Sequence, residues 1–293
     1  MTDHTAEFVA SIVAERGLAA NTAKAYQRDL AQFFAFVDGD AGTTTEDSIR
    51  TYLEELRSLD LAEASVARKF AAIRAYQRFL VIEGLREDDP TAGIDAPQRS
   101  RTLPKALTIE EVLALLDSVD TSTAVGLRDK AVLEFLYATG CRVSELCGLG
   151  QHDYDAETRT AMVTGKGQRE RLVPVGSYAA ESIDDWLPVR LVWRLQGADP
   201  GTLFLSTRGN ELSRQAVWRL VKKHGASARI EPSRLSPHVL RHSAATHMVE
   251  GGADLRSVQE ILGHASLSTT QTYTKVSPEH LYEVVMTSHP RGT

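Results

Sequence analysis

Cysteine is almost absent from this chain of 293 residues, which contains only Cys141 and Cys147. Their spacing suits neither a zinc knuckle nor a disulfide framework, so both are expected to be small buried residues of helices. No apolar run approaches the roughly 20 residues needed to span a bilayer. The first residues also lack the charged-then-apolar layout of a signal peptide. Together these absences predict a cytoplasmic protein.

An excess of basic charge is also missing, since the formal net charge is −6. Residues 1–100 hold 11 Lys+Arg and 17 Asp+Glu, which leaves 22 of each for residues 101–293. Neither part is basic overall, so any DNA-binding surface must come from local segregation of charge. The hydrophobic fraction of 42% is ordinary for a globular protein, and the length is sufficient for two domains.

Helical periodicity fills the first part of the chain and predicts a compact helical bundle. The predicted helices cover approximately 5–16, 20–37, 45–58 and 63–83. We therefore expect a helical DNA-binding domain over 1–88, a basic linker stiffened by proline over 89–106, and a second domain over 107–293.

Long cations beside small residues mark candidate DNA contacts. The fourth predicted helix carries three arginines with Ala71 and Ala75 between them, which would let a DNA backbone approach closely. A later helix, capped by Ser213, carries a second group. Each face alone is equally explained as a solvated surface. The candidate contacts are Lys24, Arg68, Arg74, Arg78, Arg214 and Arg219.

The second domain is predicted to be mainly α with a small β-hairpin or sheet. Thr108 and Glu111 form a capping box, and Ser144 is expected to cap a helix just after Arg142. The period then changes, and 159–165 and 170–175 read as two short strands joined by a hairpin turn. The run TLFLS is a candidate for a further small strand.

Residues 236–273 concentrate the side chains that can carry chemistry. Ser236 caps a helix on which His238 and Arg241 share one face, because they are three residues apart. Gly251-Gly252 ends this helix, and a second short helix runs from Asp254 to Gly263. His264 and Tyr273 follow.

The combination of these residue types suits attack on a phosphate ester. Arginine is a permanent cation whose planar fork matches phosphate oxygens. Histidine moves protons near neutral pH, and tyrosine is a nucleophile once its proton is taken. Taken singly, each has an ordinary structural explanation as a cap, a packing group or a solvated side chain. The candidate set, in chain order, is Arg142, Lys166, His238, Arg241, His264 and Tyr273.

Two other functions fit part of the pattern. A metallohydrolase would use His238, His242 and His247, but no glutamate follows the first histidine and Arg241 places a cation where a metal would sit. A DNA-binding module without catalysis would not need the full candidate set. The chain also has no GxxxxGK[ST] loop, so ATP is not expected to drive the reaction.

The motifs ATGCRVSEL, GKGQRERLVP, HVLRHSAATH and LGHASLSTTQTYT, with the ending HPRG, resemble the tyrosine recombinase (phage integrase) family. The chain is most similar to the bacterial Xer recombinases, and HSAATH with the acidic N-terminus favours the XerC branch over XerD. The resemblance implies a two-domain C-shaped DNA clamp with a SAM-like N-terminal domain. It implies site-specific recombination that resolves chromosome dimers at cell division; a phage or mobile-element integrase with the same chemistry is the alternative.

The resemblance also implies a role for each site residue. Tyr273 would form a 3′-phosphotyrosyl link, Arg142 and Arg241 would clamp the scissile phosphate, and Lys166 would protonate the leaving oxygen. His238 would assist proton transfer and His264 would bind the phosphate. Glu145 would orient the catalytic residues without contacting the DNA itself, and no metal or cofactor is implied.

The implied partners are double-stranded DNA, a related recombinase in a heterotetramer, and an FtsK-type DNA translocase. The C-terminal segment 276–293 has a small apolar stripe of Leu281, Val284 and Val285. By family likeness this stripe would dock into a neighbouring subunit. One departure from the family pattern is Ala244, where phenylalanine is frequent, and this change concerns packing rather than chemistry.

Overall fold

The structure is a computed structural model of the whole chain. It describes residues 4–14, 20–37, 44–97, 106–165, 167–194, 199–263 and 277–293. The chain divides into two compact units, Met1–Thr102 and Leu103–Thr293. The described residues are mainly helical with one small sheet, which confirms the predicted fold class.

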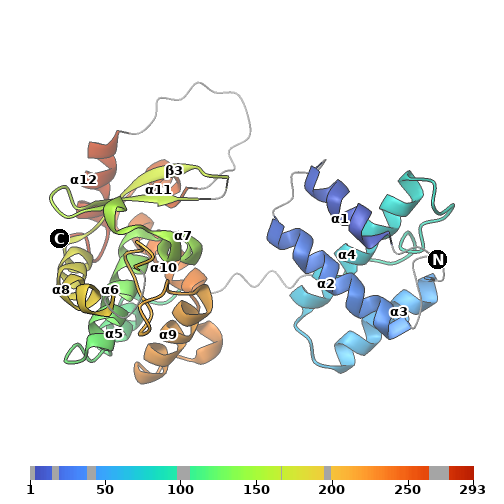
Figure 1. The fold of residues 1–293 in the computed structure, drawn as a ribbon, viewed down its shortest axis with the longest axis horizontal. Helices are drawn as coiled ribbons and strands as arrows, with labels where there is room; N and C mark the ends of the chain where they lie inside the picture. The colour runs from blue at the N-terminus through green and yellow to red at the C-terminus, as the bar shows by residue number, and fades with distance from the viewer. Residues whose placement is uncertain are drawn as a thin grey trace. The chain divides into compact units, whose positions relative to one another are not determined.

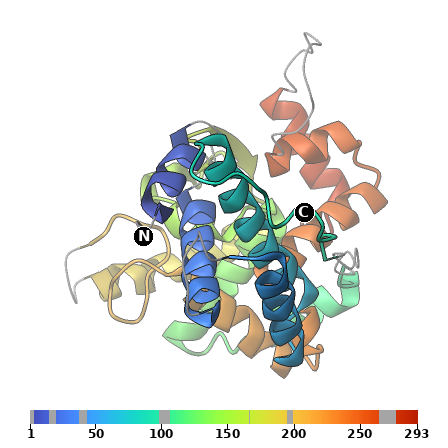
Figure 2. The same cartoon turned by 90° about the vertical axis from the view of Figure 1, so that its right-hand side faces the viewer.

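The first unit is a bundle in which four described helices pack side by side (Figures 1 and 2). They are α1 (Thr5–Ala14), α2 (Ala20–Val37), α3 (Glu46–Ser58) and α4 (Glu63–Ile82). Their apolar faces meet in one core, where the ring of Phe8 packs edge-on against Tyr76 and that of Phe33 against Tyr52. Thr45 begins α3 with a capping bond from Ser48 N–H, so a side chain satisfies a helix-end donor.

The segment after α4 folds back onto this bundle. Pro90, Thr91 and Ile94 are buried, and arginines hold the backbone carbonyls around them. Arg50 donates to Gly93 O at 2.9 Å, and Arg74 donates to the carbonyls of Thr91 and Ile94. The described beginning of the predicted linker is therefore packed against the first unit. Residues 98–105 lie outside the described residues.

The second unit surrounds the buried helix α6 (Ala124–Thr139), which packs against α8 and α10 (Figure 1). The C-cap of α6 is Gly140, in the left-handed conformation at φ 56°. Cys141, which follows it, is buried outside any helix, whereas the half-buried Cys147 lies in α7. The other helices are α5 (Ile109–Asp117), α7 (Val143–Gly148), α8 (Ser177–Arg194), α9 (Arg214–Ser227), α10 (Pro237–Glu250), α11 (Leu255–Leu262) and α12 (Pro278–Ser288).

The sheet is antiparallel in the order β1-β2-β3, from β1 (Tyr154–Asp155), β2 (Thr160–Thr164) and β3 (Glu170–Pro174). β2 and β3 form the predicted hairpin, with Thr160 opposite Pro174 and Thr164 opposite Glu170. The run TLFLS forms only isolated bridges, at Thr202 and Leu205, so it is not a strand.

The C-terminal helix α12 packs against α10, α11 and β3 of its own unit. Leu281 and Val285 join a small core with Met248 and Ile261. The apolar stripe assigned to a neighbouring subunit by family likeness is thus covered here by the same chain.

The tail after α12 is also built into the unit. His289 Nε2 lies 3.1 Å from the carbonyl oxygen of Tyr137, and the guanidinium of Arg291 lies 3.6 Å from the buried carboxylate of Glu134.

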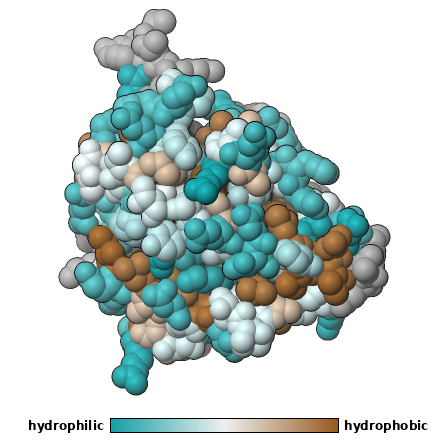
Figure 3. All heavy atoms as spheres, turned by 90° about the vertical axis from the view of Figure 1, so that its left-hand side faces the viewer, coloured by the Kyte–Doolittle hydropathy of each residue, from teal (hydrophilic) through white to brown (hydrophobic). Residues whose placement is uncertain are grey.

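Seen from the side of α8 and α12, the surface is mostly hydrophilic, with separate apolar groups (Figure 3). None of the described helices is long and apolar enough to cross a membrane.

The beginning of the second unit is fastened to α10. Leu107 N–H donates to Ser243 Oγ at 2.9 Å, and Leu107 O bonds with His247 Nε2 at 2.9 Å. The other ring nitrogen of His247 lies 2.8 Å from Tyr137 Oη. Burial lowers the pKa of His247, which favours the neutral ring.

Candidate active site

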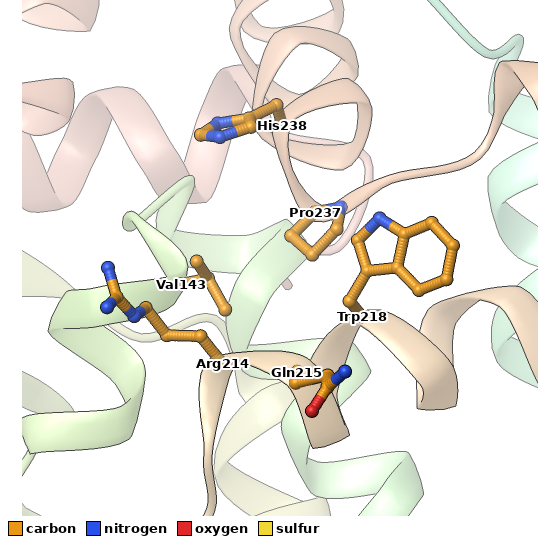
Figure 4. Close-up of a pocket in the computed structure, with 6 residues that line it drawn as sticks. All are labelled: Val143, Arg214, Gln215, Trp218, Pro237 and His238. Atoms are coloured by element: carbon orange, nitrogen blue, oxygen red, sulfur yellow. The ribbon is translucent and has the colours of Figure 1, made fainter. Parts of the chain in front are cut away.

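The N-terminus of α10 presents two of the predicted site residues, as the sequence indicated. Ser236 caps the helix by accepting from Val239 N–H, and Pro237 occupies the first turn. His238 is exposed and Arg241 is partly buried. His238 lines a cleft of about 420 Å³, together with Arg214 and the indole of Trp218 (Figure 4).

Arg142 lies at the start of α7 and is its N-cap residue. The prediction that Ser144 caps this helix is wrong. Glu145 reaches back and accepts the Arg142 N–H at 2.7 Å, which fixes the helix start two residues earlier. The same carboxylate accepts Arg142 Nη1 at 2.7 Å, so one acidic side chain holds both the backbone and the guanidinium of Arg142.

Glu145 is buried, with 1% of its side chain exposed. Besides Arg142, it accepts two parallel bonds from Arg171, at 3.0 Å from Nη1 and 2.8 Å from Nη2. Burial would raise the pKa of this carboxyl, but the hydrogen bonds from Arg171 and Arg142 lower it to about 2. Glu145 is therefore an anion at every physiological pH.

Arg142 and Arg241 are held by neighbouring carbonyls. Arg142 Nη2 donates to Gly263 O at 2.9 Å, and Arg241 Nη2 donates to Leu262 O at 2.7 Å. Arg241 also donates through Nη1 to Gly140 O at 2.6 Å. Burial and the nearby charge of Arg142 lower the pKa of Arg241 to about 10, so it stays protonated near neutral pH. The structure thus brings together two of the predicted cations.

The two glycines in this contact are required by its geometry. Gly140 and Gly263 both have positive φ, 56° and 67°. A β-carbon on Gly140 would lie 2.6 Å from a methyl group of Leu262, and one on Gly263 would lie 3.0 Å from the guanidinium of Arg171. Side chains at these positions would push the α11 end away from the arginines.

The donors of the two arginines are only partly used. A guanidinium has five N–H groups, and described residues engage two of those on Arg142 and two of those on Arg241. Three on each are left for an anion, as far as the described residues are concerned. Arg142 is also 36% exposed, so a ligand can reach it.

Three predicted site residues, Lys166, His264 and Tyr273, lie outside the described residues. The residues directly before Lys166 and His264 are described. Gly165, directly before Lys166, lies beside Glu145, since a β-carbon there would be 3.3 Å from Oε1. Gly263, directly before His264, is bonded to Arg142.

The predicted DNA contacts have different surroundings. Arg68 is paired with the buried Asp29, and Arg74 is engaged by backbone carbonyls. Arg78 is 60% exposed and lies 3.5 Å from Asp89. The remaining candidates, Lys24, Arg214 and Arg219, are exposed.

Arg171 is the residue that sequence reasoning missed. It lies in β3, and its side chain is 15% exposed. Its bonds to Glu145 place it in direct contact with the site. The available signal was a single cation inside the apolar strand that follows the Lys166 hairpin tip.

The metal-binding alternative finds no support in the histidine positions. His238 and His242 are exposed, whereas His247 is buried and bonds to Tyr137 and to Leu107 O. Among the described residues, no group of three or more His, Cys, Asp or Glu is placed to hold a metal ion.

Comparison with known proteins defines the class. Residues 105–280 match the model of the Phage integrase family, and residues 5–84 match the phage integrase N-terminal SAM-like domain. The chain therefore belongs to the phage integrase family, whose members are tyrosine recombinases.

Relatives that match over nearly the full chain are Xer recombinases. The chain is 43% identical over 300 residues to tyrosine recombinase XerD of Bifidobacterium longum, covering 98% of this chain and 97% of the relative. It is 43% identical over 301 residues to XerD of Mycobacterium leprae, covering 96% and 95%.

Solved structures agree with the fold. The XerA recombinase is 27% identical with a TM-score of 0.51, and 98% of each chain is covered. The XerH recombinase bound to a palindromic difH substrate is 22% identical with a TM-score of 0.70, covering 89% of this chain and 78% of that one.

These findings confirm the expected function. The protein is a site-specific tyrosine recombinase that breaks and rejoins DNA, of the Xer type that resolves chromosome dimers. The preference for the XerC branch is not supported, because the relatives quoted carry the XerD name. One of the two features that favoured XerC is the HSAATH motif, which includes Ala244. This residue is fully buried in the core, so its identity reflects packing.

Proposed function

We propose that Tyr273 attacks the scissile phosphate while Arg142 and Arg241 hold its two non-bridging oxygens. The observation that carries this proposal is the pair of bonds from these arginines to the adjacent carbonyls of Gly263 and Leu262. Guanidinium groups held side by side on one turn, each with unused donors, are suited to grip one anion.

The charge of the site matches the charge that the reaction develops. Three arginines and Glu145 leave a net charge of +2 on the described cluster. A phosphodiester carries one negative charge and gains a second as the fifth oxygen bonds, so these donors stabilise the transition state more than the ground state. One such donor is typically worth about 2.7–4 kcal/mol.

The remaining roles follow family likeness. The phenolic oxygen of Tyr273 bonds to phosphorus, the bond to the 5′-oxygen breaks, and Lys166 gives that oxygen its proton. His238 assists the proton transfer from tyrosine, and His264 donates a hydrogen bond to the phosphate. Attack by a 5′-hydroxyl of another strand reverses these steps and releases Tyr273, so the ester bond is kept throughout.

The DNA would lie in a C-shaped clamp between the helical domain over 1–88 and the catalytic domain over 107–293, joined by the linker 89–106. We assign the contacts along the duplex to Lys24, Arg68, Arg74, Arg78, Arg214 and Arg219. Four subunits, two of them from a related recombinase, would act on two sites in the cytoplasm. An FtsK-type DNA translocase is the further partner of this proposal.

The nucleophile is tested with a nicked DNA site that traps the covalent intermediate. Tyr273→Phe should abolish the protein–DNA adduct and leave binding intact, because only the phenolic oxygen is lost. An adduct that persists in this variant would refute the assignment.

The proton donor is tested separately. Lys166→Ala should slow cleavage of ordinary DNA and recover on a substrate with a bridging 5′-sulfur, since a thiolate leaves without a proton. Equal slowing on both substrates would count against an acid role.

A further inference from the structure

Arg171 is enclosed by the parts of the molecule that carry the site. Its guanidinium makes a two-pronged contact with Glu145, at 3.0 and 2.8 Å, and its Nε donates to Ile261 O at 2.8 Å. Only 15% of its side chain is exposed, compared with 36% for Arg142. Arg171 is therefore covered by protein where Arg142 is open.

The end of α11 is bound by arginines at three successive carbonyls. Ile261 O accepts from Arg171, Leu262 O from Arg241 and Gly263 O from Arg142. The last carbonyls of a helix have no partner within the helix and carry its negative dipole end. Three arginines thus donate to the free carbonyls of this turn. The same bonds hold each guanidinium in position.

Glu145 joins Arg171 to Arg142, and both arginines donate to the α11 turn. Its two oxygens accept four hydrogen bonds, two from Arg142 and two from Arg171. A carboxylate that lost the fork of Arg171 would have free lone pairs, and the nearest donors are those of Arg142. Arg142 would then turn toward Glu145 and away from a phosphate.

We propose that Arg171 is a positioning residue that saturates Glu145 and ties it to the end of α11, so that Arg142 and Arg241 stay aimed at one phosphate. This inference rests on the proposed function. It adds a residue that does not touch the DNA and acts through two that do. Lysine cannot replace it, because an ammonium cannot make two parallel bonds to Glu145 and a third to Ile261 O.

The test compares Arg171→Lys with Arg169→Lys, a matched change at an exposed arginine of the same hairpin. Single-turnover adduct formation is measured on nicked DNA at saturating protein. Arg171→Lys should be slower by about 10²-fold, as expected for a clamp displaced by about 1 Å, with DNA affinity little changed. Arg169→Lys should cleave like the unmodified protein.

Two altered substrates separate positioning from general damage. A methylphosphonate at the scissile position removes one negative charge, so the defect of Arg171→Lys should shrink there. A bridging 5′-sulfur relieves only leaving-group protonation, so the defect should persist. A defect of equal size on phosphate and methylphosphonate, a rescue by sulfur, or cleavage at the normal rate would each overturn the inference.

A second variant covers the case in which Arg171→Lys does not fold. Arg171→Gln combined with Glu145→Gln replaces the ion pair with neutral amides, and should fold, cleave slowly and show the same methylphosphonate effect. If the unmodified protein itself forms no adduct, the proposed function fails. If it forms one and these variants match it, only the role of Arg171 fails.

Discussion

Arginines hold backbone carbonyls in both units, but the arginines are grouped differently in the two units. In the first unit, Arg74 donates to Thr91 O and Ile94 O, and its guanidinium stacks 4.4 Å from the ring of Phe70. In the second unit, Arg142 and Arg241 are held side by side by the adjacent carbonyls of Gly263 and Leu262. A single arginine packed on an aromatic ring stabilises the fold, whereas two neighbouring arginines can also bind one anion between them.

The largest effect is expected where the first unit buries charge. Asp29 is 3% exposed and pairs with Lys69, which is 6% exposed, at 3.4 Å. Asp29→Asn should lower the free energy of unfolding of this unit by about 3–5 kcal/mol, because it leaves a buried cation unpaired. Glu46→Gln, which breaks an exposed pair with Arg50, should cost no more than about 1 kcal/mol.

Hydrogen exchange of the α2 and α4 amides in the full chain measures both variants. Equal protection in the two variants would show that burial does not distinguish these ion pairs.

The next effect concerns catalysis. Arg241→Lys should slow adduct formation by about 10²–10³-fold, since one planar donor to the phosphate is lost. Arg74→Lys, its counterpart in the first unit, should leave the rate at saturating DNA unchanged. The rate of single-turnover cleavage is measured for both variants. A comparable loss of rate in both would show that the arginines of the two units do not differ in their effect on catalysis.

A pH effect of similar or smaller size is expected at the C-terminal tail. His289 is 5% exposed, its Nδ1 accepts from Arg291 N–H at 3.0 Å, and burial lowers its pKa to about 4. The unfolded chain binds this proton near pH 6.5, so stability is complete above that pH and falls as the pH drops towards 4. The loss is at most on the order of 3 kcal/mol.

Urea unfolding between pH 7 and 4.5 tests this prediction, because the stability that Glu145 contributes is lost mainly below its unfolded pKa of 4.5, as the pH falls towards its folded pKa of about 2. His289→Gln should flatten the curve in this window. A variant as acid-sensitive as the unmodified protein would assign the effect to other groups.

The smallest effect is expected for Arg78, the most open of the three α4 arginines. Arg78→Ala should change stability by less than about 0.5 kcal/mol. If it contacts one phosphate, the slope of log affinity against log salt should fall by about 0.9. An unchanged slope would place this side chain away from the DNA.

Periodicity, caps and motifs predicted much of the fold. Ser236 and Asp254 cap helices as expected, Gly263 ends α11, and β2 and β3 form the hairpin. The start of α7 was misplaced, because the sequence cannot show that Glu145 rather than Ser144 satisfies the helix end.

The rest of the site depended on contacts between distant segments. Arg171 and Glu145 are 26 positions apart, and Arg142 and Gly263 are 121 apart, so no local pattern records their bonds. The packing of the segment after α4 was missed for the same reason, since Arg74 meets Ile94 only in the folded bundle.

The attachment of Leu107 to α10 has a mechanical consequence. Both its N–H and its C=O are bonded to this helix, at Ser243 and His247, two and six positions beyond Arg241. A pull on the polypeptide just before Leu107, such as a load on the first unit if it binds DNA as proposed, would be borne by the helix that carries Arg241. Under the proposed function, such tension would reach the phosphate-binding arginine through α10 alone, without passing through the sheet.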